Sequence, residues 1–122
     1  MAYEIHIARR TPDGQILPIA LSEWRTAVQQ TQDVRMAEGD FETSNPKTDE
    51  IITLRNAGGD AEVFFSVKAE WLRVFRWSPS GRISFRAPRD FDLATSDIRR
   101  LAAELAHALG ASLIGDEGEM YQ

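Results

Sequence analysis

The segment 71-WLRVFRWSPSGRISFRAP-88 decides the fold, because it consists of two alternating stretches around one tight turn. Pro79 suits the first central position of a type I turn, and Gly81 suits the left-handed position that follows. A loop of this kind pairs Ser78 with Arg82 and begins a β-hairpin. The register of the hairpin then follows by counting outward from the turn.

That register separates the side chains of the hairpin into two faces. Directly opposed residues share a face of a sheet, and successive residues of a strand alternate between faces. The predicted apolar face pairs Trp77 with Ile83, Phe75 with Phe85, and Arg73 with Ala87. The predicted polar face collects Arg76, Arg82 and Arg86, together with Val74 and Ser84. We therefore expect one face to join the core and the other to form an arginine-rich surface.

Strand patterns lie on both sides of this hairpin. An alternating stretch opens the chain at 3-YEIHIAR-9, and 111-ASLI-114 is a short apolar stretch near its end. The segment 34-VRMAEGDFETSNP-46 predicts one frayed or bulged strand. Between the stretches 50-EIITLRN-56 and 61-AEVFFSVK-68, the sequence AGGD predicts a hairpin turn.

Two segments show helical periodicity. The first covers residues 22–31, with Ser22 as its N-cap, and the second covers residues 96–109 and ends at Gly110. Together the elements predict a single α+β domain over residues 1–122, with a mainly antiparallel sheet of about five or six strands and two helices packed on one face. The expected core contains Trp24, Phe65, Phe75, Trp77, Phe85, Ile98, Leu101 and Leu105.

The composition restricts the class of protein. The chain has no cysteine, which excludes disulfides and thiolate metal sites. It has neither the pattern of a secretory signal nor an apolar run of about 18 residues, so we expect a cytoplasmic protein without a membrane partner. The net charge of −5 argues against nonspecific binding of nucleic acid.

Charge is distributed unevenly along the chain. Residues 31–62 contain eight acidic and three basic side chains, whereas residues 71–100 contain seven arginines and three acidic side chains. Residues 101–122 add four acidic side chains and no lysine or arginine. Separated charge of this kind steers partners, although acidic and basic regions that fold side by side would partly cancel.

The closing segment 111-ASLIGDEGEMYQ-122 contains the nearest approach to a functional site. Asp116, Glu117 and Glu119 form either a solvated exit from the last strand, a surface for a partner, or two ligands of a divalent-metal site completed by Asp40 or Glu42. Tyr121 gives this segment a side chain to bury, and the glycines at 115 and 118 permit a turn back onto the sheet.

No other pattern predicts catalysis. His6 falls on the polar face of the first strand and His107 on the flank of the last helix, and both fit surface or half-packed histidines better than metal ligands. We therefore assign no catalytic residue, no metal ligand and no cofactor. The alternating hairpin register directs Phe75, Trp77 and Phe85 away from the arginines, which argues against a stacking platform for nucleic acid.

Four stretches resemble a group of small uncharacterised bacterial single-domain proteins with no established activity. They are YEIHIAR, LSEWRTAV, NPKTDEIITL and GASLIGDEGEMY, and the resemblance extends over nearly the whole chain, from the first stretch to the last. By class, small acidic proteins of this kind are similar to immunity proteins, which neutralise a toxin by docking to it. The resemblance implies no catalytic residue.

Two functions remain as hypotheses. The first is a cytoplasmic protein that binds another protein, such as a toxin, through Asp116, Glu117, Glu119 and Tyr121. A competing contact surface consists of Arg76, Arg82 and Arg86 and would favour an acidic partner. The second hypothesis is a small enzyme with a carboxylate or divalent-metal site near the C-terminus, acting on a substrate that the sequence does not identify. The oligomeric state is not predicted.

Overall fold

A computed structural model describes residues 4–87, 97–116, 118 and 120–121. Its strands are β1 (Glu4–Arg10), β2 (Ile16–Leu17), β3 (Val34–Met36), β4 (Phe41–Ser44), β5 (Ile51–Leu54), β6 (Ala61–Phe65), β7 (Glu70–Ser78), β8 (Arg82–Arg86), β9 (Ser112–Gly115) and β10 (Met120–Tyr121). Its helices are α1 (Leu21–Gln29) and α2 (Asp97–Ala108).

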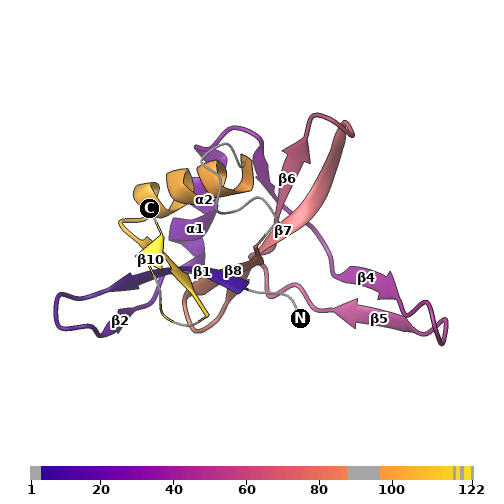
Figure 1. Ribbon diagram of the computed structural model, residues 1–122, viewed down its shortest axis with the longest axis horizontal. Coiled ribbons are helices and arrows are strands. Elements are labelled where there is room, and N and C mark those ends of the chain that lie inside the picture. Colours follow the sequence, from indigo (N-terminus) through magenta and orange to yellow (C-terminus); the bar gives the residue numbers. More distant parts are fainter. Residues whose placement is uncertain (1–3, 88–96, 117, 119, 122) are drawn as a thin grey trace.

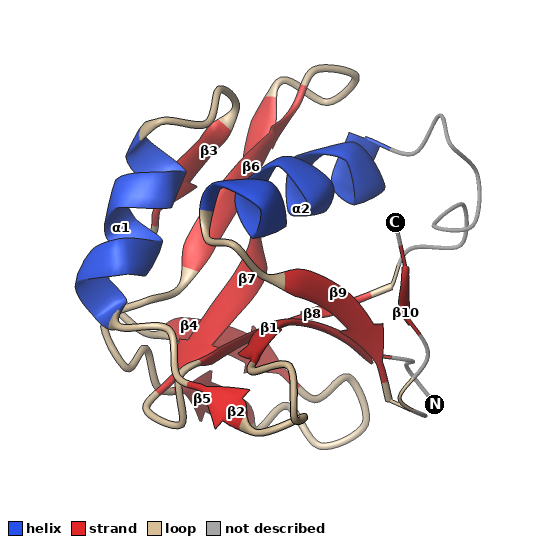
Figure 2. Cartoon of the chain, turned by 90° about the vertical axis from the view of Figure 1, so that its left-hand side faces the viewer, coloured by secondary structure: helices blue, strands red, loops and turns tan. Residues whose placement is uncertain are grey.

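The described elements form an α+β fold, as the sequence predicts. The main sheet has the order β10-β9-β1-β8-β7-β6-β3, β2 pairs with β1 beside it, and every pairing is antiparallel. Both helices lie on the same side of this sheet (Figures 1 and 2). The sheet has eight strands, more than predicted, because the short β2, β3 and β10 extend it at its margins.

The predicted register of the 71–88 hairpin is confirmed. Ser78 is opposite Arg82, Trp77 is opposite Ile83, and the backbone of Gly81 has a φ of +85°. The rings of Phe75 and Phe85 meet edge to face, with their centroids 5.2 Å apart.

The prediction for Arg73 is wrong, because β7 contains an irregularity that its sequence does not reveal. Phe75 pairs with Ala61, but Arg73 pairs with Glu62, so the register between β6 and β7 shifts by one residue at this point. A bulge reverses the alternation of side chains beyond it. Arg73 therefore lies on the face opposite the core instead of sharing a face with Ala87.

The predicted core is largely confirmed. Five predicted residues, Trp24, Phe75, Phe85, Leu101 and Leu105, are at most 2% exposed, Ile98 is 7% exposed, and Phe65 and Trp77 are half-buried against the same cluster. The cluster joins both helices to one face of the sheet. Fully burying an aliphatic or aromatic side chain stabilises a fold by roughly 1.5–3 kcal/mol, so this face accounts for much of the driving force.

Helix α1 begins one residue earlier than predicted, and Ser22 is not its N-cap. The N-cap is Ala20, whose backbone N–H donates to Glu23 Oε2 at 3.0 Å. Glu23 also accepts from Arg9 on β1 at 2.8 Å, so the same carboxylate stabilises the helix start and ties it to the sheet. These two hydrogen bonds, first that of Arg9, lower the pKa of Glu23.

The sequence predicts a hairpin turn at residues 57–60, and this prediction is wrong. β5 pairs with β4, whereas β6 pairs with β3 and β7, so this loop carries the chain from one sheet to another. Gly59 is required by packing, because a Cβ there would lie 2.4 Å from Cβ of Trp77. The Gly59 carbonyl accepts from Nε1 of the buried Trp24 at 2.7 Å.

Residues 34–46 form two strands instead of one frayed strand. β3 ends the main sheet, whereas β4 pairs only with β5 and forms a separate two-stranded arm. The arm projects away from the main sheet (Figure 1). Its apolar side chains are incompletely covered: Phe41 is 40%, Ile51 71%, Ile52 44% and Leu54 37% exposed.

Candidate functional site

The face of the sheet opposite the helices carries the candidate site. Alternation along β1, β7 and β8 directs polar side chains to this face at adjacent positions. Arg82, Ser84 and Arg86 come from β8, Arg76 lies opposite Ser84 on β7, and Glu4 and His6 lie opposite Arg86 and Ser84 on β1. We call Arg76, Arg82 and Arg86 the arginine face. The arginine-rich surface that the hairpin register predicts is therefore present.

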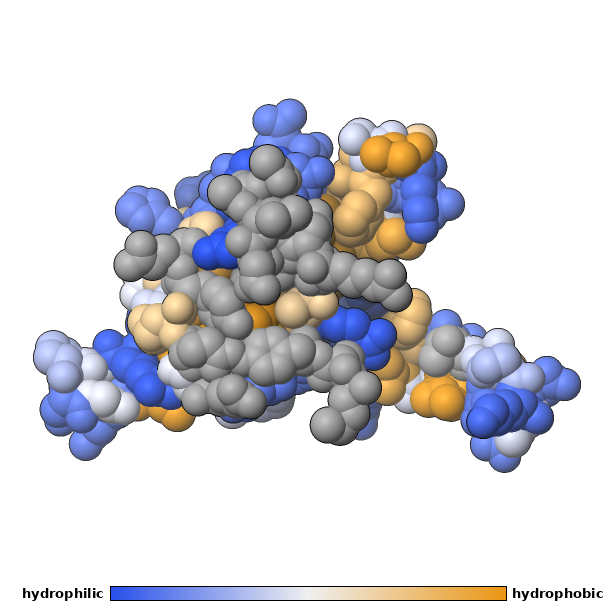
Figure 3. Space-filling view, viewed as in Figure 1, coloured by the Kyte–Doolittle hydropathy of each residue, from blue (hydrophilic) through white to orange (hydrophobic). Residues whose placement is uncertain are grey.

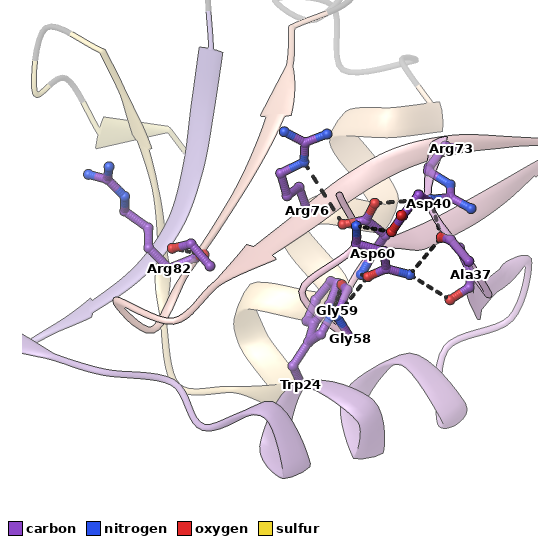
Figure 4. Close-up of polar contacts among 12 residues, drawn as sticks. Trp24, Ala37, Asp40, Gly58, Gly59, Asp60, Arg73, Arg76 and Arg82 are labelled. Atoms are coloured by element: carbon purple, nitrogen blue, oxygen red, sulfur yellow. Dashed lines mark hydrogen bonds and ion pairs between the residues drawn. The ribbon is translucent and has the colours of Figure 1, made fainter. Parts of the chain in front are cut away.

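Two of these arginines lie outside the ion pairs within the described part of the chain. Arg82 and Arg86 are exposed, and none of the ion pairs between described residues involves them. Arg76 is also exposed, and its Nε lies 3.9 Å from a carboxylate oxygen of Asp60. Figure 4 shows Arg76 and Arg82 on neighbouring strands of this face.

A buried carboxylate lies beside the arginine face. Asp60 is 1% exposed and pairs with Arg73 at 3.1 Å. Arg73 also donates to the carbonyls of Glu38 and Gly39, at 2.9 Å each, so it fastens the start of the β4–β5 arm to the main sheet. Figure 4 shows Asp60 between Arg73 and Arg76. Sequence reasoning missed this centre, because the bulge that turns Arg73 toward Asp60 has no pattern in the sequence.

A groove lies between the arm and the arginine face. It has a volume of about 240 Å³ and is lined by the arm residues Phe41 and Leu54, by Asp60, and by Arg73, Arg76 and Arg86, among others. Figure 3 shows an apolar patch in orange where the arm leaves the body of the molecule. The groove thus has apolar side chains on the side of the arm and arginine side chains on the side of the main sheet.

His6 joins the arginine face to the C-terminal segment. Its Nδ1 lies 2.8 Å from Ser84 Oγ, and its Nε2 lies 2.9 Å from Asp116 Oδ1. The prediction of a surface or half-packed histidine is wrong for His6, which is 9% exposed. Its partners are 78 and 110 residues away in sequence, so no local spacing indicates them.

Asp116 links the turn after β9 to strand β1 through both of its carboxylate oxygens. Its Oδ2 accepts the backbone N–H of Glu4 at 3.0 Å, while its Oδ1 faces His6. These two contacts, first the backbone hydrogen bond and then His6, lower the pKa of Asp116, and Arg82 lowers it further through its charge. Asp116 therefore stays ionised, with both oxygens already in use.

The other predicted residues of the terminal set are only partly described. Glu117 and Glu119 lie outside the described residues. The backbone of Tyr121 pairs with Leu113 in strand β10. The predicted turn back onto the sheet is present, because the N–H of Gly118 donates to the carbonyl of Gly115 at 3.0 Å.

The positions of Asp40 and Glu42 do not support the prediction that one of them completes a metal site with the terminal acids. Both lie on or beside β4, at the other side of the molecule from β10 (Figure 1). Asp40 accepts the backbone N–H of Asn56 at 2.8 Å. Among the described residues, the group with metal-binding spacing is instead Glu4, His6 and Asp116.

No family model, curated protein or solved structure matches this chain. The resemblance to small bacterial and immunity-like proteins therefore stays a prediction. Within the described ranges, neither helix has the length and apolar character needed to cross a bilayer.

The chain Ser84–His6–Asp116 has the residue types of a hydrolytic triad. A triad also needs backbone or side-chain donors around the oxyanion that forms in the reaction. Ser84 lies in the interior of β8, paired with His6 on one side and Arg76 on the other, so backbone groups around it serve the ladders of the sheet. We interpret the hydrogen bonds of Ser84 and Asp116 as contacts that fix the orientation of the His6 ring.

Proposed function

We propose that this protein acts by docking another protein, and that the arginine face is the main contact surface. The observation that carries the proposal is the exposed charge of Arg82 and Arg86, which form no ion pair with another described residue and lie four residues apart on one strand, with Arg76 between them on the next. Four residues of strand span about 13 Å. This spacing suits several carboxylates on one partner segment.

The chemistry of the face favours an acidic protein as the partner. Arginine binds carboxylates through two parallel hydrogen bonds and is enriched at interface positions that contribute most of the binding energy. The overall charge of −5 works against nucleic acid, whose binding depends on neutralising many phosphates. The apolar wall formed by Phe41 and Leu54 adds a place for an aliphatic or aromatic side chain of the partner.

The terminal acids form the competing contact set. Asp116 has less to offer a partner than the sequence suggested, since its oxygens already accept from Glu4 and His6. Glu117, Glu119 and Tyr121 stay in the proposal as a second contact region, suited to a basic partner.

The narrower form of the proposal is an immunity-like role in the cytoplasm. In that role the partner is a toxin, which the protein neutralises by covering it. Complementary charge would raise the rate at which the two proteins associate, an advantage for an inhibitor that must act quickly.

Pull-down with cross-linking tests the proposal. Three baits are compared in lysate of the source cells: wild type, an Arg76→Glu/Arg82→Glu/Arg86→Glu variant, and an Asp116→Ala/Glu117→Ala/Glu119→Ala variant. We expect a partner that cross-links near β7 and β8 and is lost from the arginine variant alone. If the partner is lost from the terminal variant alone, the terminal acids and not the arginine face form the contact surface. If no bait captures a partner, the docking function is contradicted.

Salt dependence is the matching control. An interface built on the arginine face should weaken as ionic strength rises through about 0.1–0.5 M, because exposed charges are screened over about 10 Å at 0.1 M salt. An interface that is insensitive to salt would contradict the proposed role of Arg82 and Arg86.

The second candidate function is a small enzyme, and the observation that favours it is the buried imidazole of His6 beside the carboxylate of Asp116, a pair that can act as a general base without Ser84 as a nucleophile. A panel of ester and phosphoester substrates, assayed with and without divalent metal, tests it. Turnover that disappears in His6→Ala but persists in His107→Ala would support this function.

A further inference from the structure

The strongest cluster of metal-ligating atoms lies where β1 meets the turn after β9. Glu4, His6 and Asp116 each offer one ligand atom, and these atoms lie within 4.8 Å of one another. The three residues come from the two ends of the chain, brought together by the pairing of Ile5 with Gly115. The folded backbone therefore fixes the cluster.

We propose that Glu4, His6 and Asp116 bind a divalent transition-metal ion. The ion would sit between an imidazole Nε2 and two carboxylates, in a cavity of about 360 Å³ that all three residues line. The site adjoins the arginine face, because Arg82 lines the same cavity, but the proposal does not rest on the docking function.

The hydrogen bonds of His6 suit a metal ligand. Metal-binding histidines as a rule use their second ring nitrogen to bond a neighbouring group, which fixes the orientation of the ring. Ser84 Oγ is such a partner for Nδ1, at 2.8 Å. The His6 side chain is 11% exposed, so its position is set by packing, and Nε2 points to the carboxylate of Asp116.

The spacing of the ligand atoms is close to what an ion requires. Ligands held about 2.0–2.1 Å from a tetrahedral ion lie about 3.3 Å from each other. His6 Nε2 and Asp116 Oδ1 are 2.9 Å apart, so they need to separate by only a few tenths of an ångström. The side chain of Glu4 is exposed and has the freedom to complete the set.

The donor set selects the class of ion. One imidazole and two carboxylates suit Zn²⁺, Co²⁺, Ni²⁺ or Mn²⁺, whereas Ca²⁺ takes six to eight oxygen ligands. Two carboxylates also balance the charge of a divalent ion. Three protein ligands leave a coordination position for water or a small ligand, and the cavity beside them provides access to it.

Metal binding would change the tautomer of His6. In the neutral ring, the 2.9 Å contact between Nε2 and the carboxylate of Asp116 fits a proton on Nε2, with the Ser84 hydroxyl donating to Nδ1. An ion on Nε2 requires the proton on Nδ1, donating to Ser84 Oγ. This switch is specific to the proposed site and is visible by NMR.

The test is titration of the untagged, chelator-treated protein with Zn²⁺ and Mn²⁺ by calorimetry, followed by ¹⁵N–¹H NMR of the histidine rings. We expect one Zn²⁺ per chain with Kd below about 100 µM, the His6 proton moved from Nε2 to Nδ1, and Mn²⁺ broadening that is strongest for residues of β1, β8 and β9 around the site. No binding at this concentration, or no change of the His6 tautomer, would overturn the proposal.

Variants separate the site from adventitious binding. His6→Ala should abolish binding, whereas His107→Ala, on the exposed side of α2, should leave it unchanged. Glu4→Gln alters an exposed side chain and should weaken binding at least about tenfold, and Ser84→Ala, which removes the hydroxyl beside Nδ1, should weaken it about 10–100-fold. Affinity unchanged by Glu4→Gln would mean an adventitious ion on His6 and would overturn the three-ligand site even if His6→Ala fails to fold.

Discussion

Gly59→Ala is the most direct test of how the loop 57–60 supports the fold. The added Cβ would lie 2.4 Å from Cβ of Trp77, 3.0 Å from its Cγ and 3.1 Å from Cδ1 of Leu21. Ordinary contacts between such atoms are about 3.5–4.0 Å, so the loop or Trp77 has to move by roughly 1 Å. The φ of Gly59 lies outside the left-handed region, so the cost comes from crowding and not from backbone strain.

The structure offers no easy relief for this crowding. Nε1 of Trp77 donates to the Ile19 carbonyl at 2.9 Å, and Nε1 of Trp24 donates to the Gly59 carbonyl at 2.7 Å. Movement of either partner therefore strains a half-buried or buried hydrogen bond. Overpacking in such a site costs typically about 1–3 kcal/mol, and we expect a loss of unfolding free energy of about 2 kcal/mol.

Urea unfolding followed by tryptophan fluorescence and circular dichroism measures this loss. The midpoint should fall at an unchanged slope, and Tm should fall by about 4 °C per kcal/mol for a domain of this size. Gly39→Ala is the control, because no atom lies within 4 Å of its added Cβ and its φ of +71° adds only backbone strain. A Gly59→Ala protein within about 0.5 kcal/mol of wild type would refute the packing argument.

Three further variants test the polar face. Asp116→Asn should have a lower urea midpoint than wild type at neutral pH, because its amide group cannot accept from both Glu4 and His6. The pKa of Asp116 is lower in the folded protein than its unfolded value near 3.8. The ionised carboxylate therefore stabilises the fold above pH 3.8, and this stabilisation is lost as the pH falls through the folded pKa. The difference in stability between wild type and Asp116→Asn should disappear in that acid range. Asp60→Ala should cost about 3–5 kcal/mol, since it leaves Arg73 without its buried partner, and equal stability in a chemical melt would contradict this. Arg82→Glu should change stability by less than about 0.5 kcal/mol, so that a loss of partner binding in this variant reports on docking.

The parts of the fold that the sequence predicts correctly rest on short-range rules. The hairpin at 71–88 follows from a turn of known geometry and from alternation, so its register extends from Ser78–Arg82 to the aromatic pair. The helix of residues 97–108 follows from a single apolar stripe that packs on the sheet. In both cases the information lies within about one helical turn or one strand pair.

The parts that the sequence does not predict depend on long-range contacts. The bulge beside Val74 moves Arg73 to the polar face, and the break at residues 37–40 separates β3 from β4; neither follows from local pattern. The arrangement of Ser84, His6 and Asp116 requires knowing that β1 lies between β8 and β9. That strand order depends on which edges meet in the folded sheet, and a single sequence does not encode it in any spacing.

The two proposals are linked through charge. Glu4 and Asp116 bring two negative charges next to Arg82 and Arg86, where they weaken the attraction of the arginine face for an acidic partner. A divalent ion between these carboxylates would cancel their charge and leave the arginines less screened. If the ion strengthens docking, the partner must strengthen binding of the ion by the same factor, because the coupling free energy between two sites is reciprocal. Measuring each affinity in the presence of the other ligand would therefore establish whether the cluster and the arginine face form one regulated site or two independent ones.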